Sequence, residues 1–460
     1  MSQPRDRGHR PDSHSNVVAP YPLHKFEGDK HVRVRVELGS PSSAQLLTCK
    51  SGRDNRKKQM QDVAEVIRRF NESRDPERLT LKYQKMRANP YVFLRGTCHL
   101  FYDQLAVSAL PSNAPTGWIC GDLHLENFGS YKGNNRLTYF DINDFDEAIL
   151  APVTWDLVRF LTSVFAAKET LDVGRGKVIT LCETFLASYV AALGSSKPYW
   201  VERDTAHGLI HTLLDDLGSR NRSDHLDKFT DVVKKRRVIR CDGERALPVD
   251  AKTHKAVEKL VRSYAAKQDD KGFFEVLDVA RRIAGVGSLG VERYVVLVEG
   301  KGSSDRNYLL DIKASTASAL SPHVQAQQPQ WDSEAKRVVA LQTRMQAVPM
   351  AFLAAIDESR RSYVLRGLQP SEDRVVLDGN KVKFADVREV VAQMGQIVAW
   401  SQLRSSGQQG AASADALVAF SANSKGWRNA LITAAEGCAA QNLAAWNAYA
   451  AEYDAGGFAI

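Results

Sequence analysis

The sequence contains few cysteines, and they lie far apart. Six cysteines are spread along 460 residues, and no two have the CxxC spacing of zinc cages and of many redox sites. A disulfide framework is not indicated either, since such frameworks belong mainly to small secreted domains. The cysteine pattern therefore predicts a reduced, cytoplasmic setting without structural zinc or disulfide bonds.

Long apolar runs are also missing. No run approaches the ~18 residues that a membrane-spanning helix needs, and the longest candidate, Ala347–Ile356, contains Pro349. The N-terminal segment is polar and basic, without the apolar core of a signal peptide. We therefore expect no membrane partner and no secretion. The residues from Met1 to about Pro20 are typical of a disordered tail.

The remaining composition is that of an ordinary soluble globular protein. Hydrophobic residues make up 43% and charged residues 25% of the chain. This length allows two or three domains, or one large two-lobed enzyme. The net charge is +8, with basic runs at Arg53–Lys58 and Lys234–Arg240. Neither run is interleaved with aromatic residues, so we expect solvated basic faces or an anionic ligand such as a nucleotide, and no nucleic-acid partner.

Two acidic clusters are the most informative feature of the sequence. They are GDLHLENFG at Gly121–Gly129 and FDINDFDEA at Phe140–Ala148, separated by a short turn and a predicted strand at Leu137–Phe140. A hairpin of this kind can bring Asp122, Asn127 and a later aspartate to one point. Mg²⁺ is usually held by one or two carboxylates together with substrate phosphates, and a further carboxylate can orient a nucleophile. The alternative is a pair of solvated turns, where Asp, Asn and Gly are common.

A glycine-rich segment lies in the second half of the chain. Gly285, Gly287 and Gly290 form G-x-G-x-x-G around Ser288 and are followed by an apolar β-branched run. A dinucleotide fingerprint needs a helix at that point, so this pattern indicates a turn between strands that covers phosphates. Lys313 ends the next predicted strand, where its ammonium group could reach phosphate oxygens. The alternative is a plain hairpin with a surface lysine.

Apolar periodicity predicts both helices and strands. We expect a helix at Gln59–Phe70, a helix that follows Phe93–Gly96 and runs through Leu105, and helices from Thr154 through Leu193. Further helices are expected at Glu334–Gln346 and from Val387 to the end, with a break at Gly407–Ser413. We expect strands at Val32–Leu38, Trp118–Cys120, Arg293–Val298, Tyr308–Lys313 and Ser362–Leu368. The charged stretch Asp204–Asp270 is predicted to be mostly helical or irregular.

These motifs resemble those of known phosphotransferases. GDLHLENFG resembles the catalytic loop HGDxxxxN of aminoglycoside- and choline-kinase-like enzymes, and FDINDFDEA followed by Trp155-Asp156-Leu157 resembles their metal loop and the helix after it. The whole chain is also similar to the uncharacterised DUF2252 family. The matching stretches are FLRG, CGDLHLENFG, FDINDFDEA, WDLVR, GVGSLG and LLDIK, which spread from about residue 50 to 405.

The resemblance implies an α+β, two-lobed protein-kinase-like fold. Because the glycine segment and Lys313 follow the acidic loops by about 160 residues, the motif order would be circularly permuted. Permutation is tolerable since domain termini often lie close together at the surface. The implied parts are an N-terminal tail and extension at 1–50, a helical large lobe at 51–275, a β-rich small lobe at 276–370, and C-terminal helices at 371–460 that return to the large lobe.

The resemblance also implies roles for individual residues. Asp122 would be the catalytic base or substrate-orienting acid. Asn127 and Asp144 would be the metal ligands. Asp141 is the second choice for the position of Asp144, and Asp146 would assist. The residues that would contact the ATP phosphates are Gly285, Gly287, Ser288, Gly290 and Lys313.

The chain departs from the phosphotransferase pattern at two positions, and the role of one further residue, Arg95, stays undecided. Cys120 occupies the place of the usual histidine. A helical glutamate to pair with Lys313 is not evident, since Glu334 is available but Ala340 is the more central residue of that helix. Arg95 could clamp an anionic group or pair with a structural acid such as Asp156.

The function expected from these motifs is ATP- and Mg²⁺-dependent phosphoryl transfer to an unidentified small molecule or protein. One alternative is nucleotidyl transfer, in which the same fold holds ATP in the flipped orientation and moves AMP onto a protein. A second is an inactive pseudokinase that acts as a binding module. A third is a basic nucleic-acid-binding protein, whose affinity would fall steeply with salt.

Overall fold

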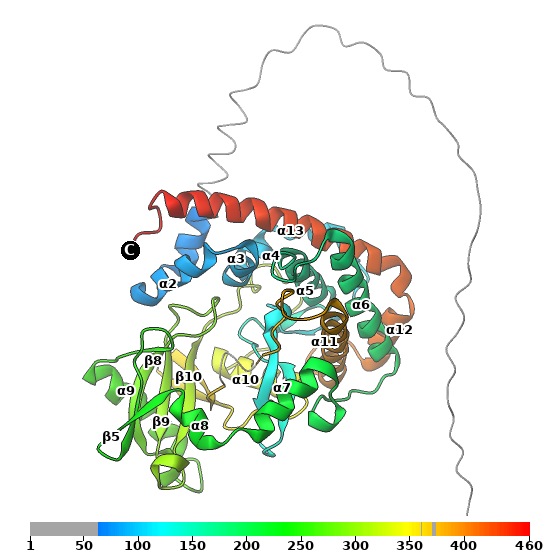
Figure 1. The fold of residues 1–460 in the computed structure, drawn as a ribbon. Helices are drawn as coiled ribbons and strands as arrows, with labels where there is room; N and C mark the ends of the chain where they lie inside the picture. The colour runs from blue at the N-terminus through cyan, green and yellow to red at the C-terminus, as the bar shows by residue number, and fades with distance from the viewer. Residues whose placement is uncertain (1–62, 360, 370–373) are drawn as a thin grey trace, which may run out of the picture. The chain divides into compact units, whose positions relative to one another are not determined.

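Helices and antiparallel strands share the chain, so the fold is mixed α+β, as expected (Figure 1). The computed structural model describes residues 63–359, 361–369 and 374–460, all of which belong to the unit Gly52–Ile460. The predicted tail and N-terminal extension, the strand at Val32–Leu38, the basic run Arg53–Lys58 and the first residues of the helix at Gln59–Phe70 lie outside the described residues.

A six-stranded antiparallel sheet carries the glycine-rich segment. Its strands are β7 (Ala246–Leu247), β8 (Val276–Arg282), β9 (Arg293–Val298), β10 (Tyr308–Ser315), β11 (Ala354–Glu358) and β12 (Arg361–Gly367), in the order β11-β12-β10-β9-β8-β7. Side chains alternate between the two faces of a strand. Leu310 and Ile312 of β10 therefore enter the core on one face, while Asp311 and Lys313 point to the other.

Each face of the sheet is covered by a different segment. Helix α9 (Ala251–Ala265) packs against the face of Ile312. On the opposite face, α8 (Arg222–Asp227) and the hairpin of β5 (Thr230–Val233) and β6 (Arg236–Ile239) contribute Leu226 and Ile239 to a small core. Lys234 and Lys235 adopt positive φ in the two-residue turn of that hairpin. The prediction that Asp204–Asp270 is helical or irregular was therefore wrong for these strands, because alternation over four residues is too short a signal.

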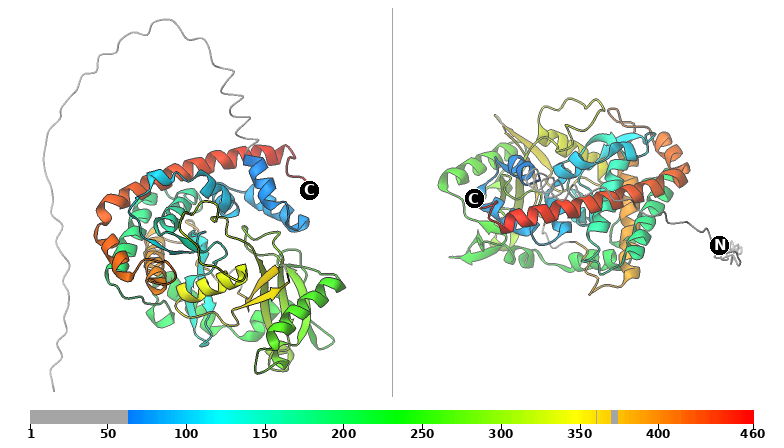
Figure 2. Two further views of the ribbon diagram at one scale, coloured as in Figure 1. Left: turned by 180° about the vertical axis from the view of Figure 1, so that it is seen from behind. Right: turned by 90° about the horizontal axis from the view of Figure 1, so that it is seen from above.

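The helices form the main hydrophobic core. Helix α5 (Thr154–Ala166) contacts α13 (Ser424–Asp454), and α6 (Arg175–Gly194) contacts α11 (Phe384–Ser405) and α12 (Ala414–Ala422). Figure 2 shows α13 extended across the other helices in the view from above. Further helices among the described residues are α2 (Pro76–Met86), α3 (Pro90–Gly96), α4 (Cys98–Gln104), α7 (Gly208–Ser219) and α10 (Glu334–Met345), and residues 63–71 are helical as well.

One helix among the described residues, α6, is long and apolar enough to cross a membrane by length and composition alone. The expectation that no such run exists was therefore too strict, because the charged and polar residues of α6 break it into short apolar stretches. The same test is passed by core helices of soluble proteins. Residues such as Leu181, Phe185 and Tyr189 of α6 are fully buried in the main core.

Short strands present the acidic loops. Strand β1 (Thr116–Ile119) pairs with β4 (Ile149–Pro152), and β2 (Phe128–Lys132) pairs with β3 (Thr138–Ile142). The 3-10 turn Leu125–Asn127 lies between β1 and β2.

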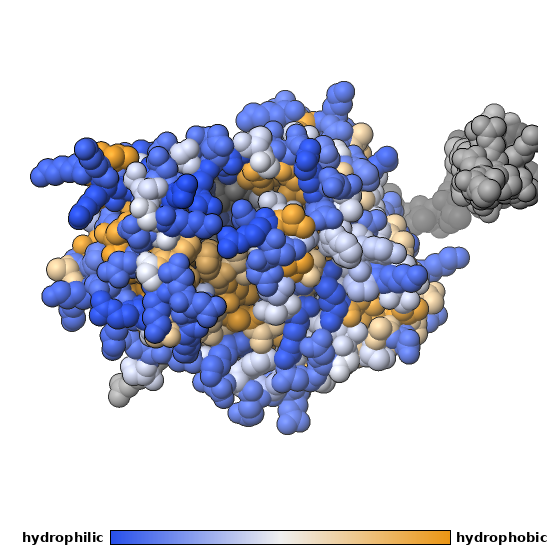
Figure 3. All heavy atoms as spheres, turned by 90° about the horizontal axis from the view of Figure 1, so that it is seen from below, coloured by the Kyte–Doolittle hydropathy of each residue, from blue (hydrophilic) through white to orange (hydrophobic). Residues whose placement is uncertain are grey.

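The five cysteines within the described residues are all free, as the sequence predicted for them. Figure 3 shows one face of the molecule, on which charged and polar residues alternate with patches of apolar ones.

Candidate functional site

The loop that carries Asp122 is held by a buried carboxylate. Asp156, in the first turn of α5, accepts hydrogen bonds from the backbone N–H groups of Cys120 and Gly121 at 2.8 and 2.9 Å. Burial raises the pKa of Asp156 to about 6, although these two hydrogen bonds act to lower it. Gly121 has φ +81°, and a Cβ there would lie 2.3 Å from the carbonyl oxygen of Glu147, so only glycine fits this turn.

Asp122 is paired with a buried arginine. Arg159, one helical turn beyond Asp156, donates to Oδ1 of Asp122 from Nη2 at 2.7 Å and from Nε at 3.1 Å. The Arg159 side chain is completely buried and also donates to the carbonyl of Leu94 at 2.7 Å. Arg159 therefore orients the Asp122 carboxylate and balances its charge.

Asn127 connects the two acidic loops. Its amide nitrogen donates to the carbonyl of Asp122 at 2.9 Å, and its amide oxygen accepts from the backbone N–H of Asp144 at 2.9 Å. The hairpin of β2 and β3 thus places both clusters at one point, as the sequence predicted. The Asp144 side chain itself is half exposed.

Lys313 meets these loops from the sheet. Its ammonium nitrogen forms an ion pair with Asp146, lies 4.0 Å from Oδ2 of Asp144, and donates to the Ser288 hydroxyl at 2.6 Å. Burial acts to raise the pKa of Asp144, but the charges of Lys313, Arg366 and Arg293 outweigh it and hold that pKa below its ordinary value. Two regions more than 160 residues apart therefore converge on one set of charged groups.

A cavity of about 90 Å³ lies between the two regions. Its lining includes most of the residues selected from the sequence, namely Asp122, Asn127, Asp144, Gly285, Gly287 and Ser288. Lys313 reaches this set through Ser288, whereas Gly290 lies on the other side of the turn. A cavity of this volume has room for phosphate-sized groups.

The glycine turn, Gly285–Gly290, is held by two basic side chains. They are Arg74, which precedes the N-cap residue of α2, and Lys82 within α2. Arg74 donates to the carbonyls of Gly287 and Leu289 at 2.6 and 2.9 Å, and Lys82 donates to the carbonyl of Gly287 at 3.2 Å. Lys82 is fully buried, and burial together with the charge of Arg74 lowers its pKa well below the usual range. These hydrogen bonds hold the glycine turn against α2.

An arginine cluster covers the sheet face beside Lys313. The buried carboxylate of Asp311 is bound by Arg293 at 2.6 Å, Arg282 at 2.8 Å and Arg366 at 3.2 Å. Burial acts to raise the pKa of Asp311, and the three guanidinium groups more than reverse this, so its pKa lies well below the usual range. All three arginines line the cavity. Three cations share one carboxylate, so the cavity wall carries surplus positive charge.

The structure gives the contacts of three residues whose roles the sequence left open. Asp141 does not line the cavity, because its buried carboxylate accepts from the backbone N–H groups of Ile142 and Ala347 and from Arg404. Arg95 does not pair with Asp156 but with Glu126, at 2.9 Å. Glu334 pairs with Arg337 of its own helix, and the acidic partners of Lys313 are Asp146 and Asp144.

Oxygen atoms dominate the part of the cavity where a metal was expected. Within the described residues, no group of three or more His, Cys, Asp or Glu side chains is arranged to hold a metal ion. Mg²⁺ needs fewer protein ligands, since water and phosphate oxygens complete its shell. Asp144 and Asn127 both line the cavity. The amide oxygen of Asn127 accepts from the backbone N–H of Asp144 and keeps a second lone pair, so a carboxylate and an amide oxygen are the donor set for a hard cation that arrives with phosphates.

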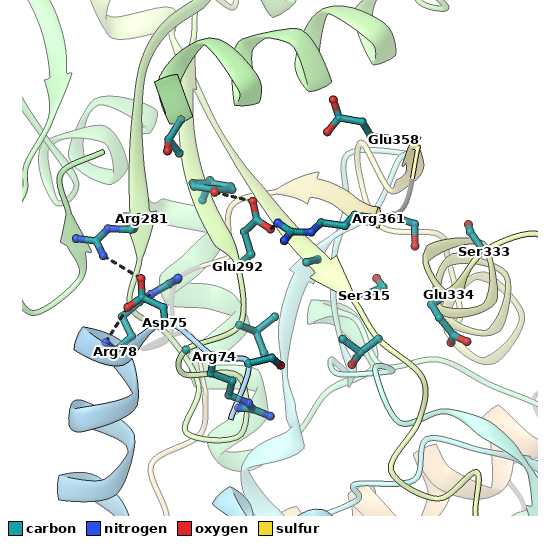
Figure 4. A pocket seen from close by; sticks show the side chains of 18 of the residues that line it. Arg74, Asp75, Arg78, Arg281, Glu292, Ser315, Ser333, Glu334, Glu358 and Arg361 are labelled. Atoms are coloured by element: carbon teal, nitrogen blue, oxygen red, sulfur yellow. Dashed lines mark hydrogen bonds and ion pairs between the residues drawn. The ribbon is translucent and has the colours of Figure 1, made fainter. Parts of the chain in front are cut away.

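A larger groove of about 1270 Å³ lies on the opposite side of the glycine turn (Figure 4). Its charged side chains largely satisfy one another: Asp75 binds Arg78 and Arg281, and Glu292 binds Arg361. The groove therefore lacks the unbalanced positive charge of the smaller cavity.

Glu147 gives the site a pH-dependent contribution to stability. Burial raises its pKa to about 7, despite a hydrogen bond from the backbone N–H of Ala319. The folded state therefore binds more protons than the unfolded state between about pH 4.5 and 7. The free energy of unfolding should therefore fall as the pH rises through that window, and Glu147 should account for about 1–3 kcal/mol of the decrease. Chemical denaturation of the wild type and of Glu147→Gln at several pH values measures the difference.

Asp156 titrates in the same direction and is present in both proteins, so the difference between the two curves isolates Glu147. Glu183→Gln changes an exposed glutamate of α6 and serves as the control. A stability difference between wild type and Glu147→Gln that stays constant from pH 4 to 8 would contradict the assignment.

Several residues of the site were not selected from the sequence. Arg159 had a local signal, because it follows Asp156 by three residues on one face of α5. No local signal marked the residues of the arginine cluster. They lie on four neighbouring strands and are brought together only by strand pairing; they are Arg282 of β8, Arg293 of β9, Asp311 of β10 and Arg366 of β12.

Fold and site together define a mixed α+β protein in which a lysine, a glycine turn and two acidic loops surround a small cationic cavity. A model of the family described as "Uncharacterized protein conserved in bacteria (DUF2252)" matches residues 74–452. The chain belongs to the DUF2252 family. No curated protein and no solved structure gives a significant match.

Proposed function

We propose that this protein is an ATP- and Mg²⁺-dependent phosphotransferase with a two-lobed, kinase-like fold in permuted chain order. The observation that carries the proposal is the position of Lys313, 4.0 Å from Asp144 and bonded to Ser288 of the glycine turn. Phosphoryl transfer depends mainly on positioning and on neutralising charge. A lysine, backbone N–H groups and carboxylates around one phosphate-sized cavity are the parts that this requires.

The residues divide the work in the proposed reaction. Lys313 neutralises phosphate oxygens, and the segment Gly285–Ser288 covers them. Asn127 and Asp144 would hold Mg²⁺, which supplies further charge neutralisation when bound. Asp122, oriented by Arg159, accepts a hydrogen bond from the acceptor hydroxyl and takes up its proton. In the same step the acceptor oxygen bonds to the γ-phosphorus, the bond from that phosphorus to the bridging oxygen breaks, and ADP leaves with the electron pair. Cys120 stands where related enzymes have histidine, and the loop is supported here by the Asp156 carboxylate.

One observation favours nucleotidyl transfer as a second candidate. The three arginines around Asp311 offer positive charge on the sheet face beyond Lys313. A nucleotide in the flipped orientation would place phosphates there. ATP labelled separately at the α and γ positions distinguishes the two reactions, since phosphoryl transfer moves the γ label and nucleotidyl transfer moves the α label.

Mg-ATP should raise the thermal unfolding midpoint of the wild type by several degrees. A ligand that binds only the folded state at 100 times its Kd contributes about 2.7 kcal/mol. Lys313→Met should lose most of this increase, each variant being compared with its own nucleotide-free midpoint. Lys301→Met, an exposed lysine in the turn between β9 and β10, should keep it.

The outcome also separates the other interpretations. If the thermal unfolding midpoint of the wild type does not respond to Mg-ATP, nucleotide binding is contradicted. The remaining interpretation is then a binding module that does not use ATP. A response that is equal with and without Mg²⁺ would favour an inactive pseudokinase.

A further inference from the structure

A second cavity, of about 400 Å³, adjoins the first. The two share Arg95, Arg282 and Arg374 as lining residues, together with the start of the glycine turn. The second cavity is the larger and has a mixed wall. One part is apolar, and its residues are Phe229, Ile239, Ile283, Val295 and Leu368.

Positive charge is concentrated where the cavities join. Arg95 and Arg374 share a single carboxylate, Glu126, at 2.9 and 3.0 Å. Arg282, on the opposite wall, shares the Asp311 carboxylate with two other arginines. Arg95 and Arg282 are largely buried, with 11% and 7% of their side chains exposed. Cations removed from water need counter-charge, and the protein supplies too little of it at this point.

Hydrogen-bonding capacity is also unused at the junction. Nε of Arg95 is buried and donates no hydrogen bond. Arg282 is held by the carbonyl of Gln369 and by Asp311, which it shares with two other arginines. Buried polar groups are normally satisfied, and guanidinium groups bind phosphate or carboxylate with two parallel bonds. Glu126 has 40% of its side chain exposed, so it can move aside when an anion arrives.

We propose that Arg95, Arg374 and Arg282 form an anion subsite for the phosphoryl acceptor. The acceptor carries a phosphate or carboxylate group, which binds at the junction, and a largely apolar body, which lies against Ile239, Val295 and Leu368. This inference rests on the proposed function, because the adjoining phosphate-sized cavity is assigned there to the nucleotide. It narrows the acceptor to an anionic small molecule.

Phenyl phosphate and benzoate are suitable probes, since each joins an anion to an apolar ring. Isothermal titration at constant ionic strength should show wild-type binding of phenyl phosphate at least several-fold tighter than that of inorganic phosphate. Arg95→Gln and Arg374→Gln should each weaken it about tenfold or more, while Arg388→Gln, an exposed arginine of α11, should not. Comparison with benzoate shows whether phosphate or carboxylate is preferred.

Two further variants make the test specific. Glu126→Gln should tighten phenyl phosphate binding several-fold, because it removes the competing carboxylate; a purely structural role of Glu126 would not produce a gain. Lys313→Met should leave phenyl phosphate binding unchanged. Loss of binding in Lys313→Met but not in Arg95→Gln would overturn the proposal, as would no binding to the wild type. Failure of Mg-ATP binding with phenyl phosphate binding retained would instead contradict the proposed function alone.

Discussion

Replacing Asp144 with alanine is expected to abolish Mg²⁺-dependent nucleotide turnover, with a loss of about 10³-fold or more. The side chain is half exposed at the cavity, and its carboxylate is the proposed contact to the metal that accompanies the phosphates. Removing one preorganised group that stabilises transition-state charge typically costs 10²–10³-fold in rate. Loss of the metal adds to this. Turnover is measured as phosphate or pyrophosphate release at saturating ATP across a Mg²⁺ titration.

The nucleotide-free unfolding midpoint of Asp144→Ala should change little, because the replaced side chain is half exposed and its nearest cation, Lys313, keeps its ion pair with Asp146. Asp216→Ala, an exposed aspartate of α7, is the matched control and should retain full turnover. Unchanged turnover in Asp144→Ala would defeat the assignment. If Asp146→Ala alone removed the Mg²⁺ dependence, the metal ligand would be Asp146.

Replacing Asp311 with asparagine should destabilise the protein by about 3–5 kcal/mol, the usual cost of removing one partner from a buried ion pair. The substitution keeps the shape of the side chain and leaves three guanidinium groups, two of them buried, without their shared carboxylate. Urea denaturation of the wild type and Asp311→Asn gives the difference in free energy of unfolding.

A surface ion pair provides the control for Asp311. Asp231→Asn breaks the pair with Arg240, in which the aspartate side chain is 52% exposed, and should cost no more than about 1 kcal/mol. The pKa of Asp311 is depressed, so its contribution is present above about pH 4 and is lost as the pH falls further. The cost of Asp311→Asn should therefore shrink in acid. A cost below 1 kcal/mol at neutral pH would show that the cluster is not held by this carboxylate.

The regular elements could largely be predicted from the sequence. The apolar stripe of Thr154–Ala166 and the β-branched runs at Arg293–Val298 and Tyr308–Ser315 are strong local signals. The hairpin of β5 and β6 was missed, because each strand is only four residues long and three of the four residues of β5 are exposed. Its role depends on Ile239, which is buried only because the sheet lies beneath it.

The site could be predicted in part. Asp122, Asn127 and Asp144 lie in two neighbouring loops whose spacing restricts where their side chains meet, and Ser288 and Lys313 belong to one continuous glycine-and-strand pattern. The pairing of Arg95 with Glu126 and the engagement of Asp141 by Arg404 could not be predicted. Each depends on a partner whose position is decided by packing of distant segments.

The sequence by itself determined the local conformations and the residue types that meet within a few tens of positions: the two acidic loops, the glycine turn and the strand that carries Lys313. Only the tertiary structure decided that these segments surround one cavity and that arginines outnumber carboxylates along its wall. The reason is that backbone propensity and side-chain period act over a few residues, whereas pairing of charges across strands and loops depends on the register and packing of segments that are remote in the chain.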